Sequence, residues 1–330
     1  MNILQKLTPI AATVLLSLGT VSAAQADDSI YTSVMDNLSI SGFIDMSYVY
    51  SDPDGGDSVS VSGIDQAEID ISYDFGNKLT ATVDIEYQNS AEGVDLEQAF
   101  ITYAVSDSFS VKAGRFLSYT GWETEEPTGL FQYSGAGYAP YFYGYYQQGI
   151  SGLYTGDGFS AAVSLVNDLA GPQSVDSEEI GVETMLAIMP SDSVTVKGFY
   201  SFEKLAGTDE DTTLVNLWAS YAKDALTLAA EYNMSENAPA YVWAGAGVDA
   251  EATGFLLMAN YGFESFALTL RYHDWEIEDA SGATFEDASG FTISPSFSVN
   301  ENLLMVFEYR MDEINDVDIN TFAVEALITF

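Results

Sequence analysis

The sequence lacks several residue types, and each absence removes a class of protein. It has no cysteine, so disulfide scaffolds, thiolate metal sites and cysteine nucleophiles are excluded. Its one histidine, His273, cannot form the histidine cluster that a zinc site needs. Lys and Arg number 9 against 50 Asp and Glu, a net charge of −41, so the chain has no basic surface for binding nucleic acid.

Long apolar runs are also missing beyond residue 26. No uninterrupted stretch of roughly 18 apolar residues occurs there, which excludes transmembrane helices. Yet 47% of the residues are hydrophobic, and the chain holds 21 Tyr and 19 Phe, too many for a disordered acidic protein. The apolar residues must therefore belong to a fold of another kind.

Residues 1–26 have the features of a secretory signal. Lys6 lies in a short n-region, residues 10–21 are mostly apolar, and Ala24-Gln25-Ala26 gives the small-x-small pattern of a cleavage site. We predict export with cleavage after Ala26, which leaves residues 27–330 as one domain. The alternative, an N-terminal membrane anchor, needs about 20 apolar residues and is disfavoured.

The remainder of the chain shows an alternation of period two. In residues 79–88 the odd positions are Leu, Ala, Val, Ile and Tyr, and the even positions are Thr, Thr, Asp, Glu and Gln. A strand places such residues on opposite faces, whereas a helix would mix them on every turn. The same alternation recurs at 67–75, 266–273, 303–312 and 322–330. The fold is predicted to be all-β.

The connections between these strands differ in length in a regular way. Seven are short, at 75–78, 105–108, 155–158, 190–193, 223–225, 262–265 and 299–302. They alternate with eight longer stretches at 51–62, 89–95, 118–147, 167–177, 204–212, 236–249, 276–287 and 312–318. Fifteen connections join 16 strands, within a range of 14 to 18. Short periplasmic turns and long extracellular loops are typical of a transmembrane antiparallel β-barrel.

Aromatic residues fall at two depths along these predicted strands. Tyr73, Tyr103 and Tyr221 are among those beside the short turns, and Tyr87 and Tyr232 are among those near the long connections. The two groups are separated by about 20 Å along a strand. Two aromatic girdles bracket the lipid-facing band of an outer-membrane barrel, which favours this fold over a water-soluble sandwich.

The polar face of each strand would then line a lumen. Its predicted acids are Asp45, Glu68, Asp70, Asp84, Glu86, Glu97, Glu183, Glu231, Glu308 and Glu325, and its main bases are Lys112, Lys197, Arg271 and Arg310. Rings of acids favour cations in transit, so a weakly cation-selective pore is predicted. For any single residue, pairing with a base or hydration of the wall is the alternative.

Three segments carry a resemblance to a known family. They are Leu96-Glu97-Gln98-Ala99-Phe100-Ile101-Thr102-Tyr103, Val111-Lys112-Ala113-Gly114-Arg115-Phe116 and the terminal Ala326-Leu327-Ile328-Thr329-Phe330. With the hairpin pattern, they resemble the Gram-negative outer-membrane 16-stranded porins, and more narrowly the putative beta-barrel porin group.

The resemblance implies a water-filled channel for passive diffusion of small hydrophilic solutes and ions. The implied partners are outer-membrane lipid, lipopolysaccharide and the barrel-assembly machinery, with Phe330 as the assembly signal. Arg115 resembles the strand end before the constriction loop, and it departs from the alternation of Val111 and Ala113. Either a bulge turns it inward or the strand ends at Gly114. Whether the porin is a monomer or a homotrimer stays open.

The third long connection, 118–147, is rich in glycine and aromatic residues. A loop of this length is usually functional or disordered, and its aromatic density argues against disorder. The resemblance implies a loop folded into the lumen, and a surface flap is the alternative. The loop lacks the Pro-Glu-Phe-Gly-Gly type of tip found in enterobacterial porins. The pore-lining and constriction candidates are Glu123, Glu125 and Glu126 on the loop, with Lys112, Arg115, Asp84, Glu86, Glu97, Arg271 and Arg310 on the strands.

Other chemistry is sparse. Residues 52–57 have carboxylates near the spacing of a calcium loop but lack the full motif, so weak binding of divalent ions is favoured over a dedicated site. No nucleophile elbow accompanies His273. We predict neither catalysis nor a cofactor. A non-conducting structural or adhesion barrel and an outer-membrane hydrolase remain the alternatives.

Overall fold

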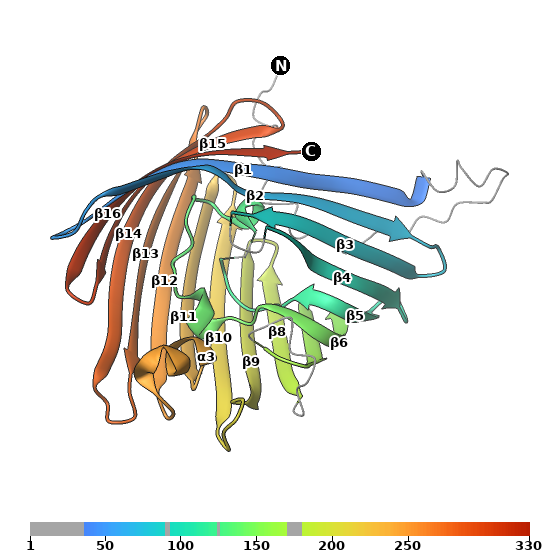
Figure 1. Ribbon diagram of the computed structural model, residues 1–330. Helices are drawn as coiled ribbons and strands as arrows, with labels where there is room; N and C mark the ends of the chain where they lie inside the picture. Colours follow the sequence, from blue (N-terminus) through green and yellow to red (C-terminus); the bar gives the residue numbers. More distant parts are fainter. Residues whose placement is uncertain (1–35, 90–92, 124–125, 170–179) are drawn as a thin grey trace.

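The computed structural model describes residues 36–89, 93–123, 126–169 and 180–330 as a single closed β-barrel (Figure 1). Every strand pairs antiparallel with its neighbour in the chain, and β1 closes the barrel by pairing with β16. The predicted all-β barrel of 16 strands is confirmed. The strands are β1 Leu38–Pro53, β2 Val59–Asp74, β3 Leu79–Gln88, β4 Val94–Ala104, β5 Phe109–Leu117, β6 Tyr146–Gly156, β7 Phe159–Val166, β8 Gly181–Ser191, β9 Val194–Lys204, β10 Asp211–Lys223, β11 Leu226–Glu236, β12 Glu251–Gly262, β13 Ala267–Glu278, β14 Thr284–Ser298, β15 Leu303–Ile314 and β16 Val317–Thr329.

Between the described strands, helical structure occurs in two of the loops. It comprises η2 Pro127–Gly129, α2 Ala139–Phe142, α3 Pro239–Tyr241 and η3 Val242–Ala246. Across the described ranges, no helix is long and apolar enough to cross a membrane. The predicted signal segment, 1–26, lies outside the described residues.

The period-two pattern separates the two faces of the wall as predicted. Glu68 is 4% exposed while its neighbour Ile69 is 48% exposed, and the same contrast holds between buried Asp84 and exposed Ile85. The apolar face therefore points away from the barrel and the acidic face points into it. Of the aromatic residues predicted to form girdles, Tyr87, Tyr103, Tyr221 and Tyr232 are exposed, whereas Tyr73 is half-buried.

The barrel closes at the last residue of the chain. The backbone nitrogen of Phe330 donates to the carbonyl of Gly42 at 3.0 Å, and that of Gly42 donates back to Phe330 at 3.1 Å. A side chain at Gly42 would collide with the carbonyl of Glu68 and with the ring of Phe330. Glycine is therefore needed where β1, β2 and the C-terminus meet.

The seven predicted short turns are confirmed, but three of the predicted long connections are wrong. The strands run on, and the connections shrink to 54–58, 279–283 and 315–316. Asn315 and Asp316 have φ angles of 50° and 64°, the conformation that a two-residue hairpin turn requires. Val59 and Val61 continue the alternation of β2 into a stretch whose Asp, Gly and Ser content had suggested a loop.

Two β-bulges interrupt the wall on the β1–β4 side. Asp45 pairs with Gln66 and Met46 with Ile64, so Asp65 is an extra residue in β2. In the same way Asp84 pairs with Gln98 and Ile85 with Leu96, which leaves Glu97 as the extra residue in β4. A bulge adds one residue and re-aims its side chain. Both bulges in this wall add a carboxylate.

Candidate functional site: the lumen and its third loop

The loop between β5 and β6, residues 118–145, is called L3 here, and its described residues, 118–123 and 126–145, lie inside the barrel (Figure 1). The Ser118 hydroxyl donates to Glu183 on β8, and the backbone nitrogen of Trp122 donates to Glu231 on β11 at 2.7 Å. The backbone nitrogen of Ser134 donates to Glu308 on β15 at 3.1 Å. These carboxylates face inward, so the described part of L3 lies in the lumen, as the resemblance implied.

Two arginines of the wall hold the middle of L3. Arg271 on β13 forms a buried ion pair of 2.7 Å with Glu123, and neither side chain is more than 8% exposed. Arg310 on β15 donates to the carbonyls of Gly135 at 2.7 Å and Ala136 at 3.1 Å. Three of the predicted pore residues, Glu123, Arg271 and Arg310, are thus brought together as anchors of the loop.

Aromatic side chains fill the space between L3 and this wall. Tyr138 packs edge-on against Trp275 with ring centroids 6.0 Å apart, and Trp122 packs against Trp218 at 5.3 Å. The hydroxyls of Tyr138 and Tyr143 both donate to Glu231. Burial raises the pKa of both phenols well above its ordinary value, so they stay protonated and remain donors. We call strands β8–β15, to which L3 is bound, the loop wall.

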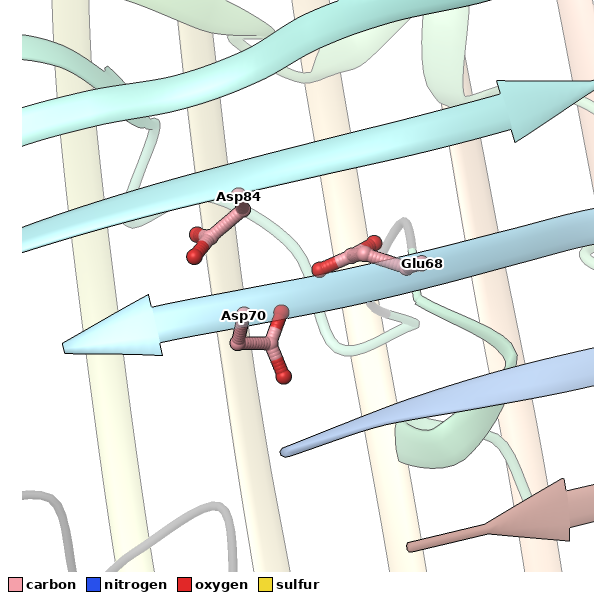
Figure 2. A group of neighbouring side chains, drawn as sticks. All are labelled: Glu68, Asp70 and Asp84. Carbon is pink, nitrogen blue, oxygen red and sulfur yellow. The ribbon is translucent and has the colours of Figure 1, made fainter. Parts of the chain in front are cut away.

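The opposite side of the lumen carries a row of carboxylates with few partners. Glu68 and Asp70 on β2, Asp84 and Glu86 on β3, and Glu97 on β4 form what we call the acid wall. Figure 2 shows the side chains of Glu68 and Asp70 on β2 and of Asp84 on the neighbouring β3. One carboxylate oxygen of each lies within 4.8 Å of those of the other two. Two cross-strand pairs on the inward face, Glu68 with Glu86 and Asp70 with Asp84, each set two acids side by side.

Hydrogen-bond donors reach only part of the acid wall. The Gln98 amide donates to Asp84 at 2.8 Å, and the Gln66 amide donates to Glu86 at 3.1 Å. Glu97 is fully buried, yet neither of its carboxylate oxygens has a hydrogen-bond partner. One oxygen of Glu68 and one of Asp84 are also buried without a hydrogen-bond partner. Burying a carboxylate without a hydrogen-bond donor costs folding free energy. A proton or a bound cation would offset this cost in this part of the lumen.

One loop acid faces this wall. Glu126 of L3 has a carboxylate oxygen within 4.8 Å of oxygens of Glu68 and Glu97, and Tyr146 donates to it at 3.2 Å. Burial, with the charge of Glu97 next in importance, raises the pKa of Glu126 to about 9. The third loop candidate, Glu125, lies outside the described residues.

The two bases predicted near the loop lie on β5. The ammonium of Lys112 is 4.7 Å from the ring centroid of Phe100 and 5.4 Å from that of Phe116, as in cation–π contacts. Arg115 lies 3.9 Å from Asp95. β5 continues to Leu117, so the alternative in which it ends at Gly114 is wrong. The pairing of β5 with β6 runs through Arg115 without a register shift, so the bulge of the other alternative is not found there either.

A cavity of about 280 Å³ opens beside the acid wall. Asp45, Asp65, Gln66, Gln88 and Asn89 line it. Asp65 was not among the predicted lumen acids, because a regular strand would turn it to the lipid once Gln66 faces inward. The break of alternation at Ile64-Asp65-Gln66 is the sequence signal that could have revealed it.

His273 lies buried in the loop wall rather than in a reactive arrangement. Its Nε2 is 3.5 Å from Asp312, and its ring stacks on Trp275 with centroids 5.5 Å apart. In the described part of the chain, no serine hydroxyl bonds to either ring nitrogen. The geometry therefore lacks the nucleophile and base pair that a serine hydrolase needs.

Comparison with solved structures shows similar barrels. OmpF of Salmonella typhi, in complex with daunomycin, is 18% identical with a TM-score of 0.69 and covers 91% of this chain and 99% of its own. The trimer form of OmpT, an outer membrane protein of Vibrio cholerae, is 13% identical with a TM-score of 0.64 over 89% of this chain and 100% of its own. An anion-selective porin from Comamonas acidovorans is 13% identical with a TM-score of 0.62 over 89% and 99%. At these identities the likeness shows the fold alone.

The family is shown by sequence. No curated protein matches the chain, but residues 37–327 match the family model described as putative beta-barrel porin-2, OmpL-like. The match covers nearly the whole barrel, from before β1 into β16. The chain belongs to the putative beta-barrel porin-2, OmpL-like family, and it is an outer-membrane β-barrel porin.

Proposed function

We propose that this porin is a water-filled channel through which small hydrophilic solutes and ions diffuse passively, with a weak preference for cations. The observation that carries the proposal is the position of L3. Most of its hydrogen bonds to the wall and its ion pair attach it to the loop wall, on the side of Arg271 and Arg310, while Tyr133 also reaches Asp65 on β2. The cavity lies on the other side, beside the acid wall.

The charges that face this path are unequal. Arg271 and Arg310 are engaged with L3, and the ammonium groups of Lys112 and Lys197 lie over aromatic rings. Among the described residues, no acid of the acid wall forms an ion pair, although the charge of Lys112 acts on Asp84. A lumen wall with uncompensated negative charge raises the local concentration of cations and lowers that of anions.

The fold itself does not set the preference. The Comamonas acidovorans porin is described as anion-selective, and it shares the barrel with this chain at 13% identity. Selectivity therefore depends on which charged side chains point into the lumen. In this chain they are mainly carboxylates.

Reconstitution in a planar bilayer tests the proposal. We expect stepwise single-channel conductance and a reversal potential of cationic sign across a KCl gradient. An absence of conductance would favour the structural or adhesion barrel instead. Conductance with an anionic reversal potential would keep the channel and refute the cation preference.

A hydrolase is the second alternative, and the surroundings of His273 give it no support. We infer that the porin is not an enzyme. His273→Ala should leave any weak ester or lipid hydrolysis by the purified protein unchanged. Loss of a reproducible activity in that variant would contradict the inference.

The proposed setting is the outer membrane, with export by the signal at 1–26 and cleavage after Ala26. Outer-membrane lipid and lipopolysaccharide would surround the apolar face. The barrel-assembly machinery would read the C-terminal strand, and deletion of Phe330 should lower the yield of assembled barrel. A homotrimer is the assembly to test first, because the Vibrio cholerae OmpT structure is described as a trimer form.

A further inference from the structure

We propose that Glu68, Glu97 and Glu126 form a binding site for a divalent cation of the size of Ca²⁺, which bridges L3 to the acid wall inside the lumen. Glu68 comes from β2, Glu97 from the bulge of β4, and Glu126 from L3. A cation held there would join two strands and the loop at one point.

The distances fit a single ion. One carboxylate oxygen of each residue lies within 4.8 Å of those of the other two. Two oxygens that bind the same Ca²⁺ at about 2.3–2.6 Å lie at most roughly 5 Å apart, whereas Mg²⁺ ligands at about 2.0–2.1 Å lie at most roughly 4 Å apart. The upper limit on the spacing is compatible with Ca²⁺, which accepts flexible carboxylate geometry, whereas Mg²⁺ demands near-ideal octahedral ligands and gives up its water reluctantly.

Glu97 gives the second, independent reason to place a ligand here. It is 0% exposed, and both of its oxygens lack a hydrogen-bond donor. One oxygen of Glu68 lacks a donor as well. Within the described residues, no lysine or arginine lies within ion-pair distance of either acid, since the nearby Arg115 pairs with Asp95. A buried carboxylate without a donor or counter-charge is the arrangement that a metal ion satisfies.

Further oxygens stand next to the three ligands. Asp70 and Asp84 share a second group with Glu68, again within 4.8 Å (Figure 2). Ca²⁺ takes about six to eight oxygen ligands, which bidentate carboxylates and water supply in flexible sites. The two groups overlap at Glu68, so they offer one extended site rather than two separate ones.

The loop in residues 52–57 is a separate feature. It comprises the end of β1 and most of the turn to β2, and a dedicated site was disfavoured there from its sequence. The site in the lumen uses none of its residues.

Calcium titration of the barrel isolated in detergent, after removal of metals with EDTA, tests the site. We expect isothermal titration calorimetry to give about one Ca²⁺ per barrel, weaker binding of Mg²⁺, and a rise in the thermal midpoint as Ca²⁺ binds the folded state. Glu97→Gln should lower Ca²⁺ affinity at least about tenfold, because loss even of a group supporting a ligand costs about 10–100-fold.

Two further variants complete the test: a second substitution in the site and a control outside it. Glu126→Gln removes a ligand from the loop and leaves the strands intact, so it decides the matter if Glu97→Gln fails to fold. Glu236→Gln removes an exposed acid at the end of β11 and should bind Ca²⁺ as the unaltered protein does. Absence of Ca²⁺ binding by the unaltered barrel, as expected if the acids simply share protons, would overturn the site. Equal affinity in Glu126→Gln and Glu236→Gln would also overturn it.

Binding does not depend on conduction, whereas any effect of Ca²⁺ on the current rests on the proposed function. A barrel that conducts but binds no Ca²⁺ would refute the site alone. A barrel that binds Ca²⁺ but carries no current would refute the proposed channel alone. We expect both to hold, with Ca²⁺ lowering the conductance of the unaltered porin more than that of Glu126→Gln.

Discussion

The loop wall and the acid wall both bury carboxylates in the same lumen, but they treat them in opposite ways. On the loop wall, Glu183 accepts from Ser118 and Tyr119 of L3, and Glu231 accepts from Trp122, Tyr138, Tyr143 and Asn216. On the acid wall, Glu97 has no donor and Glu68 has an oxygen without one. An inward acid in this barrel can therefore either bind the loop through hydrogen bonds or leave negative charge beside the proposed path. The number of hydrogen-bond donors around the carboxylate distinguishes the two cases.

The difference follows from where L3 lies. Its backbone nitrogens and tyrosine hydroxyls supply donors only to the strands it touches. Acids on those strands become structural, because hydrogen bonds to a charged group contribute about 1.5–3 kcal/mol each. Acids on the far side receive fewer donors from the loop and face the proposed path. Four predictions use this contrast, from the largest expected effect to the smallest.

The largest effect is expected from loss of the ion pair between Arg271 and Glu123, which attaches L3 to the loop wall. Arg271→Met leaves Glu123 buried without its partner, which should cost about 3–5 kcal/mol of unfolding free energy. It should also loosen L3 and increase the single-channel conductance. The measurements are urea unfolding of the detergent-folded barrel and bilayer recording.

The matched control is an exposed ion pair of the same chain. Lys204 lies 2.6 Å from Asp211, with the two side chains 40% and 60% exposed. Lys204→Met should cost less than about 1 kcal/mol and leave the conductance unchanged. Equal costs for the two variants would mean that the Arg271 pair does not anchor the loop.

The same substitution on the two walls should have opposite effects on stability. Glu231→Gln removes one of the acceptor oxygens that four donors share, and it should destabilise the barrel by about 1–3 kcal/mol. Glu97→Gln, measured in EDTA, removes a buried charge that has no donor and should leave stability equal or higher. Unfolding curves of both variants, measured under the same conditions, provide the check. A similar loss of unfolding free energy in both would contradict the difference between the two walls.

Ion selectivity should respond mainly to the acid wall. Glu68→Gln and Glu183→Gln each remove one inward carboxylate, but only Glu68 faces the proposed path. The reversal potential in a KCl gradient should move toward that of a neutral pore in Glu68→Gln and stay close to the original in Glu183→Gln. An equal shift in both would show that the loop wall also contributes to the path.

The smallest effect concerns pH. The pKa of Glu126 is raised from 4.5 to about 9, so the folded barrel binds more protons than the unfolded chain between these values. Stability from this group is therefore present at low pH and is lost as pH rises toward about 9. In EDTA, Glu126→Gln should flatten this decline in the unfolding midpoint. An unchanged pH profile would show that Glu126 is not buried against the acid wall.

The inward and outward faces of the strands could be predicted well from the sequence, because alternation is a local pattern. Alternation in segments such as 79–88 depends only on neighbouring residues, and Asp84 and Glu86, which it places on the inward face, are buried. The strand ends were harder. Asn315 and Asp316 resemble a loop by composition, and only their positive φ angles reveal a tight turn.

The roles of the lumen residues could not be predicted in the same way. Glu123 and Arg271 are separated by 148 positions, and no pattern in the sequence links them. The same applies to the tyrosines that hold Glu231, since the path of L3 through the barrel decides which acids receive donors. Asp65 was missed because a bulge, rather than alternation, places it.

The bulges at Asp65 and Glu97 also bear on how such a pore can be altered. An inserted residue in a regular strand would invert every side chain beyond it and expose charges to lipid. A bulge absorbs the extra residue, so the apolar outer surface is preserved while the lumen gains a charge. Deletion of Glu97 should therefore disturb the barrel less than deletion of a residue from a regular part of a membrane strand. Single-residue insertions and deletions at bulges offer a route to re-engineer selectivity that leaves the lipid-facing pattern untouched.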